Sequence, residues 1–402
     1  MLITNDWHLT YCTNVHPGES WADSFENLKK YVPTIKSEVA PNQSFGIGLR
    51  LSALATEEIQ QDGHLDEFKD WLSQENCYVF TVNGFPYSSF HRQRVKDDVY
   101  KPDWTSTQRL NYTLGMFDVL KELLPEGVDG GISTSPIAYK PWFFDQPEQL
   151  QSTFTVSTDH IVQVIEHLYH IHQETGKELH LDIEPEPDCV LETTQELVQY
   201  FREYLIPQGV TTLGQSLGVS SSEAEEVILR HCQMCFDICH AAVEYESPSE
   251  SFQLLRDSGV RIGKVQISAA IRGDVLDGSN EIIEEMAQLD ESTYLHQTIA
   301  RKQDGQLLRL RDLDQLNKVN PQDTAELRTH FHVPIFMDEF GSLKSTQPTI
   351  LETFEELKKH RSTNHLEVET YTWEVLPKAL QIELSKSVER ELQWVTSHLD
   401  PS

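Results

Sequence analysis

Four β-like segments of this sequence carry, at or near their ends, side chains that can bind a divalent cation. Glu184 closes the strand-like part of LDIEPEPD, Asp237 and His240 lie in FDICH, Gln266 lies in VQIS, and Glu369 lies in LEVETYTW. Several carboxylates can share one +2 charge, while histidine and glutamine add neutral nitrogen and oxygen donors. These segments therefore predict a site for zinc, manganese or iron, with Glu184 as its principal ligand.

Some of the same residues suit proton transfer. A carboxylate that binds a cation beside a substrate can also act as a base, so Glu184 and Glu369 are the predicted catalytic groups and His240 is the neutral alternative. The run THFHVP adds His330 and His332, which could complete a second cation site with His240.

The elements that must position these residues follow a βαβα rhythm. Segments such as LDEFKDWLSQ, with apolar residues at helical spacing, separate eight β-like runs. Eight repeats favour a closed (β/α)8 barrel, the TIM barrel of the α/β class, over an open sheet. The predicted strands span 8–13, 45–51, 77–83, 130–135, 178–184, 233–239, 262–268 and 365–372.

One connection is longer than the others, at about 271–345, between the last two strands. It contains a predicted hairpin around Asp304-Gly305 and a ninth β-like run, HVPIFMDEF at 332–340. We assign that run to the insertion, which makes Glu369 rather than Glu339 the last ligand. No linker marks a second domain, so residues 1–402 are expected to form one barrel with this insertion.

Alternation along each strand separates an apolar face from a polar one. Residues such as Ile47, Leu49, Tyr78, Phe80 and Val82 are predicted to pack under the helices. The polar face would line the barrel interior, and an internal ion-pair network is the alternative to a metal site there. The predicted interior residues are His8, Thr10, Arg50, Asn83, Ser133, Asp182, Glu184, Asp237, Gln266, Glu367 and Glu369.

Four residues are candidate substrate contacts: His8, His16, Arg50 and Asn83. Two of them have a structural alternative, since His8 could be a satisfied core histidine and Arg50 could balance neighbouring acids. Ser20 in HPGESW is predicted to cap the first helix.

Composition excludes several function classes. A formal charge of −32 makes nucleic acid an unfavourable partner. No segment resembles a membrane span or a secretion signal, so a soluble, cytoplasmic protein with reduced cysteines is expected. GxGxxG, P-loop and GxSxG motifs are absent from the sequence.

The ordered set Glu184, Asp237 with His240, Gln266 and Glu369 resembles the ligand set of the xylose isomerase-like barrels. That superfamily includes sugar isomerases, keto-sugar epimerases, inosose dehydratases and endonuclease IV. Many members have histidine where Gln266 stands, which implies weaker metal binding here. The pair His330 and His332 is similar to ligands that endonuclease IV places between its last two strands.

A closer resemblance covers nearly the whole chain. HLTYCTNVHPGESW, VNGFPY, LDIEPEPD, FDICHAAVE, RTHFHVPIFMDEFG and LEVETYTWEVLP look like the EboE proteins of bacterial ebo gene clusters, described as metabolite traffic proteins. The resemblance implies partners from the same gene cluster and work on a metabolite precursor.

Three functions remain open from the sequence. The first is a metal-dependent isomerase, epimerase or dehydratase for a small polyhydroxylated or cyclic metabolite. The second is a non-catalytic carrier that uses the barrel pocket, and the third is an endonuclease IV-like phosphodiesterase.

Overall fold

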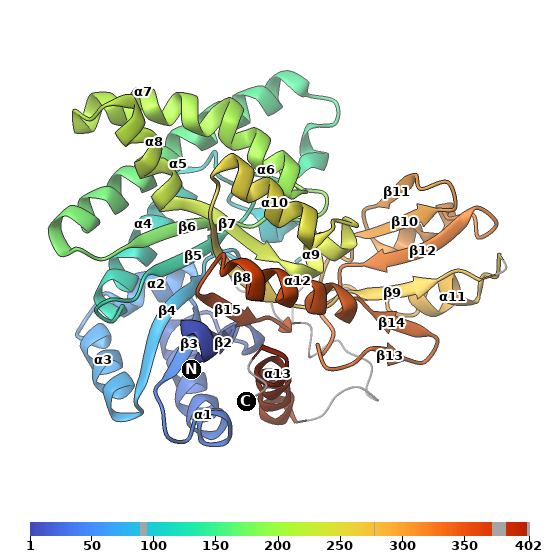
Figure 1. Ribbon diagram of the computed structural model, residues 1–402, viewed down its shortest axis with the longest axis horizontal. Coiled ribbons are helices and arrows are strands. Elements are labelled where there is room, and N and C mark those ends of the chain that lie inside the picture. Colours follow the sequence, from blue (N-terminus) through green and yellow to red (C-terminus); the bar gives the residue numbers. More distant parts are fainter. Residues whose placement is uncertain (89–94, 277, 372–382, 400–402) are drawn as a thin grey trace.

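Eight parallel strands form the barrel at the centre of the computed structural model (Figure 1). The structure describes residues 1–88, 95–276, 278–371 and 383–399. The predicted (β/α)8 barrel is confirmed, and a short antiparallel strand, β1 (Leu2–Ile3), extends its sheet. The barrel strands are β2 (Trp7–Tyr11), β3 (Phe45–Arg50), β4 (Cys77–Asn83), β5 (Gly130–Thr134), β6 (Leu179–Ile183), β7 (Cys232–Asp237), β8 (Ile262–Ile267) and β15 (His365–Val368).

Helices cover the outside of this sheet (Figure 1). Helix α1 begins where Ser20 accepts a hydrogen bond from the backbone N–H of Asp23, as predicted, and it buries Trp21, Phe25 and Leu28. The helices are α1 (Trp21–Val39), α2 (Ala53–Ile59), α3 (His64–Gln74), α4 (Thr107–Leu123), α5 (Pro147–Thr175), α6 (Thr194–Tyr200), α7 (Ile206–Leu217), α8 (Ser221–His231), α9 (Ile238–Val243), α10 (Pro248–Ser258), α11 (Glu281–Ala287), α12 (Gln347–His360) and α13 (Leu384–Leu399).

Two side chains of β4 lie on the opposite face of the strand from the one predicted. The register against β3 shifts between Ile47 and Gly48, which leaves one extra residue on β4. Such a bulge reverses the alternation on one side of it. Tyr78 and Phe80 therefore contact His8 inside the barrel instead of packing under the helices.

The segment after β8 forms a second sheet beside the barrel (Figure 1). Its strands pair antiparallel, and β10 and β11 form a hairpin around Asp304-Gly305. Only Glu339 and Phe340 of the run 332–340 lie in a strand, so β15 is the last barrel strand. The sheet contains β9 (Ile271–Asp274), β10 (Thr298–Lys302), β11 (Leu307–Leu310), β12 (Thr324–Thr329), β13 (Glu339–Phe340) and β14 (Leu343–Ser345).

None of the helices in the described ranges combines the length and the apolar composition needed to cross a bilayer. Position 372 of the last predicted strand and residues 372–377 of LEVETYTWEVLP lie outside the described residues.

Candidate metal centre

Three buried carboxylates converge at the mouth of the barrel, where the strands end. Glu184 follows β6, Asp237 closes β7, and Glu369 follows β15. One oxygen from each lies within 4.8 Å of the others. Three carboxylates in a buried site repel one another unless they bind protons or share a cation. This geometry brings together three of the residues that the sequence analysis named as ligands.

Local structure fixes the direction of Asp237. Its Oδ1 caps helix α9 by accepting the backbone N–H of His240 at 3.0 Å, and it also accepts the Ser268 hydroxyl at 2.8 Å. The remaining Asp237 oxygen and Glu184 Oε2 are buried and have no hydrogen-bond partner among the described residues. Buried carboxylate oxygens without donors are costly, so this donor set fits a divalent cation.

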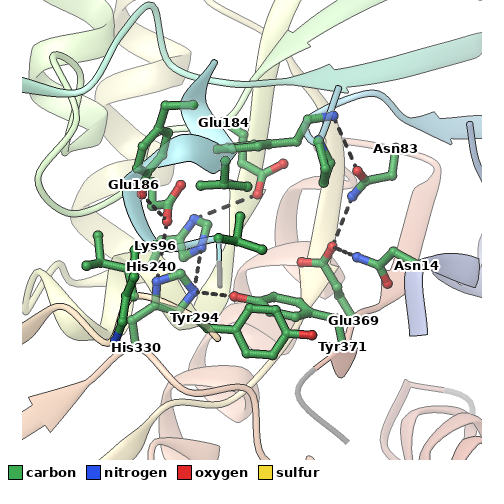
Figure 2. Close-up of a pocket in the computed structure, with 16 residues that line it drawn as sticks. Asn14, Asn83, Lys96, Glu184, Glu186, His240, Tyr294, His330, Glu369 and Tyr371 are labelled. Carbon is green, nitrogen blue, oxygen red and sulfur yellow. Dashed lines mark hydrogen bonds and ion pairs between the residues drawn. The ribbon is translucent and has the colours of Figure 1, made fainter. Parts of the chain in front are cut away.

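Two asparagines hold Glu369. Asn14 Nδ2 donates to Glu369 Oε1 at 2.8 Å, and Asn83 Nδ2 donates to the same oxygen at 3.0 Å (Figure 2). Asn83 was predicted as a substrate contact, and it does line the cavity. The sequence analysis missed Asn14, which lies in a short turn after β2.

Protonation follows from this crowding. Burial, together with Asp237, raises the pKa of Glu184 to about 8. Burial and the charges of Glu184 and Asp237 raise the pKa of Glu369 well above its usual range. Burial would also raise the pKa of Asp237, but His240 and His332 outweigh it and lower that pKa. Without a cation, Glu184 and Glu369 therefore hold protons at neutral pH while Asp237 is ionised.

Three imidazoles form a second group beside the carboxylates. Their Nδ1 atoms face only oxygen acceptors: Pro185 O at 3.0 Å from His240, Gln297 Oε1 at 2.8 Å from His330, and Glu369 O at 2.9 Å from His332. In a neutral ring each Nδ1 therefore carries the proton and Nε2 has the lone pair. For His240, burial opposes the charged form, but Asp237 and Glu186 outweigh it and raise its pKa.

These lone pairs point toward a common region. The Nε2 atoms of His240 and His330 are 3.2 Å apart, and those of His330 and His332 are also 3.2 Å apart. Asp237 offers an oxygen to His240 and His332 within 4.8 Å. Oriented imidazoles with oxygen-bound Nδ1 atoms are typical of metal-binding histidines. The arrangement could hold a second cation next to the three carboxylates.

A cavity opens above these groups (Figure 2). Its volume is about 570 Å³, a figure that includes the open mouth. Tyr100, Tyr294 and Tyr371 contribute aromatic surface, and the carboxylates and imidazoles contribute a polar end. Tyr294, Leu295 and His330 come from the long insertion, so that segment builds part of the wall.

Comparison with known proteins identifies the architecture. A Mycobacterium smegmatis xylose isomerase-like TIM-barrel protein in complex with magnesium aligns over 99% of this chain and 100% of its own, with a TM-score of 0.50 and 12% identity. The fold is a TIM barrel, as in this neighbour. No protein-family model and no curated protein matches the sequence.

Two further solved structures cover this barrel at a similar level. A D-tagatose 3-epimerase-like protein aligns over 98% of this chain and 97% of its own, at 11% identity and a TM-score of 0.49. The IOLI protein with a bound zinc atom aligns over 98% of both chains, at 10% identity and a TM-score of 0.48.

The other predicted residues of the barrel lie away from the cavity. His8 Nδ1 hydrogen-bonds the Tyr78 hydroxyl at the opposite end of the strands. His16 bonds Tyr11 and stacks on Tyr31. Arg50 donates to the backbone oxygens of Gly18 and Ser88.

Gln266 is buried inside the barrel, and its register partner on β7 is Asp237. Its Oε1 accepts the Cys235 thiol at 3.1 Å, while its Nε2 has no hydrogen-bond partner among the described residues. The Gln266 side chain therefore lies beside Asp237 in the sheet, and its Oε1 is already hydrogen-bonded to Cys235.

Two polar residues of this interior escaped the sequence analysis. Glu186, two residues after Glu184, lines the cavity and approaches His330 Nδ1 at 3.4 Å. Lys264, two residues before Gln266, forms a fully buried ion pair with Glu367 at 2.6 Å. For Lys264 the signal was present, because strand alternation places it on the same face as Gln266. Lys264 is therefore the interior cation that neutralises an acid, while Arg50 donates to backbone oxygens.

Proposed function

We propose that this chain is a metal-dependent isomerase, epimerase or dehydratase for a small polyhydroxylated or cyclic metabolite. The observation that carries the proposal is the convergence of Glu184, Asp237 and Glu369 within 4.8 Å beneath a cavity lined by tyrosines and polar side chains. The resemblance of the motifs to EboE proteins supports a place in the processing or traffic of a metabolite precursor, with partners from the same gene cluster.

The residues around the cavity suit this chemistry. A divalent cation in the carboxylate group would polarise neighbouring substrate oxygens and acidify the adjacent C–H or O–H. Glu184 and Glu369 are the groups that would take up and return the substrate proton, because both line the cavity and their burial gives them high proton affinity. His240 lines the same cavity and is the neutral alternative.

The shape of the cavity favours a ring with hydroxyl groups. Tyr100, Tyr294 and Tyr371 offer faces on which the apolar side of a sugar or cyclitol ring can pack. The carboxylates and Asn83 lie where hydroxyl groups need acceptors and donors.

The test compares wild type with Glu184→Gln and with Glu356→Gln, a buried carboxylate on α12 that does not line the cavity. Wild type and Glu356→Gln are expected to contain at least one equivalent of zinc, manganese or iron by elemental analysis and to turn over a member of a sugar and cyclitol panel. Glu184→Gln should lose at least one equivalent of metal relative to wild type and most of the turnover. A folded Glu184→Gln protein with full metal content and full turnover would refute the proposal.

The three imidazoles favour a second candidate, a phosphodiesterase that uses more than one cation. A charge of −32 argues against nucleic acid as its substrate. Hydrolysis of bis-p-nitrophenyl phosphate that depends on His330 would favour this candidate. Binding of a panel member without turnover or metal would instead indicate a carrier.

A further inference from the structure

A second cluster of potential ligands lies at the opposite end of the barrel. Asp129 precedes β5, His180 lies on β6, and His365 begins β15; we call these three residues the floor cluster. Glu369 lies four positions after His365, just beyond the end of β15. At the usual rise per residue of a strand this is about 13 Å. The buried Lys264–Glu367 ion pair occupies the layer between the two ends. The floor cluster is thus separate from the carboxylates at the mouth.

The hydrogen bonds of His180 leave one nitrogen directed at Asp129. His180 Nδ1 lies 2.6 Å from Asp182 Oδ1, so Nδ1 donates its proton to that carboxylate. In the neutral ring the lone pair is then on Nε2, which lies 3.6 Å from Asp129 Oδ2 and has no hydrogen bond to a described residue. A lone pair that faces a carboxylate is repulsive unless a proton or a metal cation lies between them.

His365 is the second imidazole of the floor cluster. It is fully buried, and neither of its ring nitrogens makes a hydrogen bond within the described ranges. Its Nε2 lies 3.3 Å from Asp129 Oδ1. Burial of an imidazole without hydrogen bonds is costly, so a ligand on Nε2 would remove a cost that the protein otherwise carries.

The spacing matches a small divalent cation. Nitrogen and oxygen ligands 2.0–2.2 Å from a tetrahedral zinc ion lie about 3.3–3.6 Å from one another. Asp129 Oδ1 lies 3.3 Å from His365 Nε2, and Asp129 Oδ2 lies 3.6 Å from His180 Nε2. Ligand atoms of the three residues lie within 4.8 Å of one another. Asp182 binds the far nitrogen of His180, which is the usual carboxylate support of a zinc-binding histidine.

The floor cluster also has room for its side chains and is open to solvent. A Cβ on Gly131 would lie 2.4 Å from His180 Cε1, so only glycine permits this position of the imidazole. The Asp129 side chain is 39% exposed and lines a surface cavity with Glu178 and Gln233. A cation can therefore enter from solvent, and water can complete its coordination.

We propose that the floor cluster is a zinc site with Asp129, His180 and His365 as its protein ligands. The ion would link β5, β6 and β15 at the closed end of the barrel. The competing arrangement is a metal-free ion-pair network, in which a doubly protonated His180 bridges Asp129 and Asp182. The two differ in whether zinc is bound.

The decisive measurement is a zinc-edge anomalous difference map from wild-type crystals grown with zinc. The expected peak lies within about 2.0–2.2 Å of His180 Nε2, His365 Nε2 and an Asp129 oxygen. The same map shows separately whether zinc binds the carboxylates at the barrel mouth. Absence of zinc from the floor cluster is therefore distinguishable from failure of the proposed function. No peak at the floor cluster would overturn the inference.

Solution measurements supply the matched variants. Asp129→Ala should bind one equivalent of zinc fewer than wild type and lose a zinc-dependent rise in Tm. His8→Gln changes a neighbouring histidine of the same barrel end, which bonds Tyr78 instead of Asp129, and should keep both. Unchanged zinc content in folded Asp129→Ala would also overturn the inference.

Discussion

The ion pair between Lys264 and Glu367 is the strongest test of how this polar barrel interior is balanced. Both side chains are fully buried, and their atoms are 2.6 Å apart. Lys264→Met leaves the Glu367 carboxylate without its cation, so we expect the free energy of unfolding to fall by about 3–5 kcal/mol. Urea unfolding followed by circular dichroism measures this loss.

The control is the double variant Lys264→Met/Glu367→Gln, in which no charge remains unpaired. It should recover most of the stability that Lys264→Met loses, because removal of both partners avoids the buried lone charge. If single and double variants are equally destabilised, packing of the lysine chain rather than its charge is responsible.

Strand alternation predicted the direction of individual residues well wherever strands are regular. It placed Glu184, Asp237, Gln266 and Glu369 on the interior face, and the structure brings the three carboxylates together. It failed for Tyr78 and Phe80, because a bulge depends on pairing with β3 and leaves no mark in the sequence of β4. Arg50 bonds Gly18 from another part of the chain, and His16 stacks on Tyr31 of helix α1. Such contacts lie beyond the local strand pattern, so that pattern could not reveal the two positions.

Helix α13 carries a pH-sensitive contact. Burial raises the pKa of Glu391 to about 7, although Thr370 and the Ile335 N–H donate to it. The folded state then holds a proton that the unfolded state releases above about pH 4.5, so this contribution is full below pH 4.5 and is lost as pH rises through 7.

Glu391→Gln should remove that dependence. We expect the variant to match wild type near pH 4.5 and to exceed it by about 3 kcal/mol at pH 8, since one pKa unit corresponds to about 1.4 kcal/mol. Unfolding free energies across pH 4.5–8 give the comparison. Parallel curves for the two proteins would contradict the prediction.

Barrel strands were predictable as elements because each is a short β-like run between amphipathic helices. The long insertion was recognisable by its length and its Asp304-Gly305 turn. Its six-stranded sheet was not, because β13 and β14 have only two and three residues and alternation needs longer runs.

Gln297 couples the insertion to the barrel. Its Oε1 accepts from His330, while its Nε2 donates to Tyr100 at 2.8 Å and approaches Glu186 Oε1 at 3.3 Å. Gln297→Ala removes the acceptor that orients His330, so we expect a 10- to 100-fold loss of affinity for a cation at the imidazoles. Zinc titration against a competing chelator measures it.

The control is Gln303→Ala, an exposed residue of the same insertion beside its hairpin. It should bind zinc as wild type does. Equal affinities for Gln297→Ala and wild type would mean that packing alone orients His330.

The order of the ligands along the chain has a consequence for biosynthesis. Asn14 and Glu369, which hydrogen-bond each other, are 355 residues apart, and Glu184 and Asp237 lie between them. A ribosome emits Glu369 only after more than nine-tenths of the polypeptide has left it. Strand β15, the last barrel strand, leaves the ribosome directly before Glu369, so closure of the barrel and assembly of the carboxylate group occur at the same late stage. Capture of a cation there would therefore report that the barrel has closed.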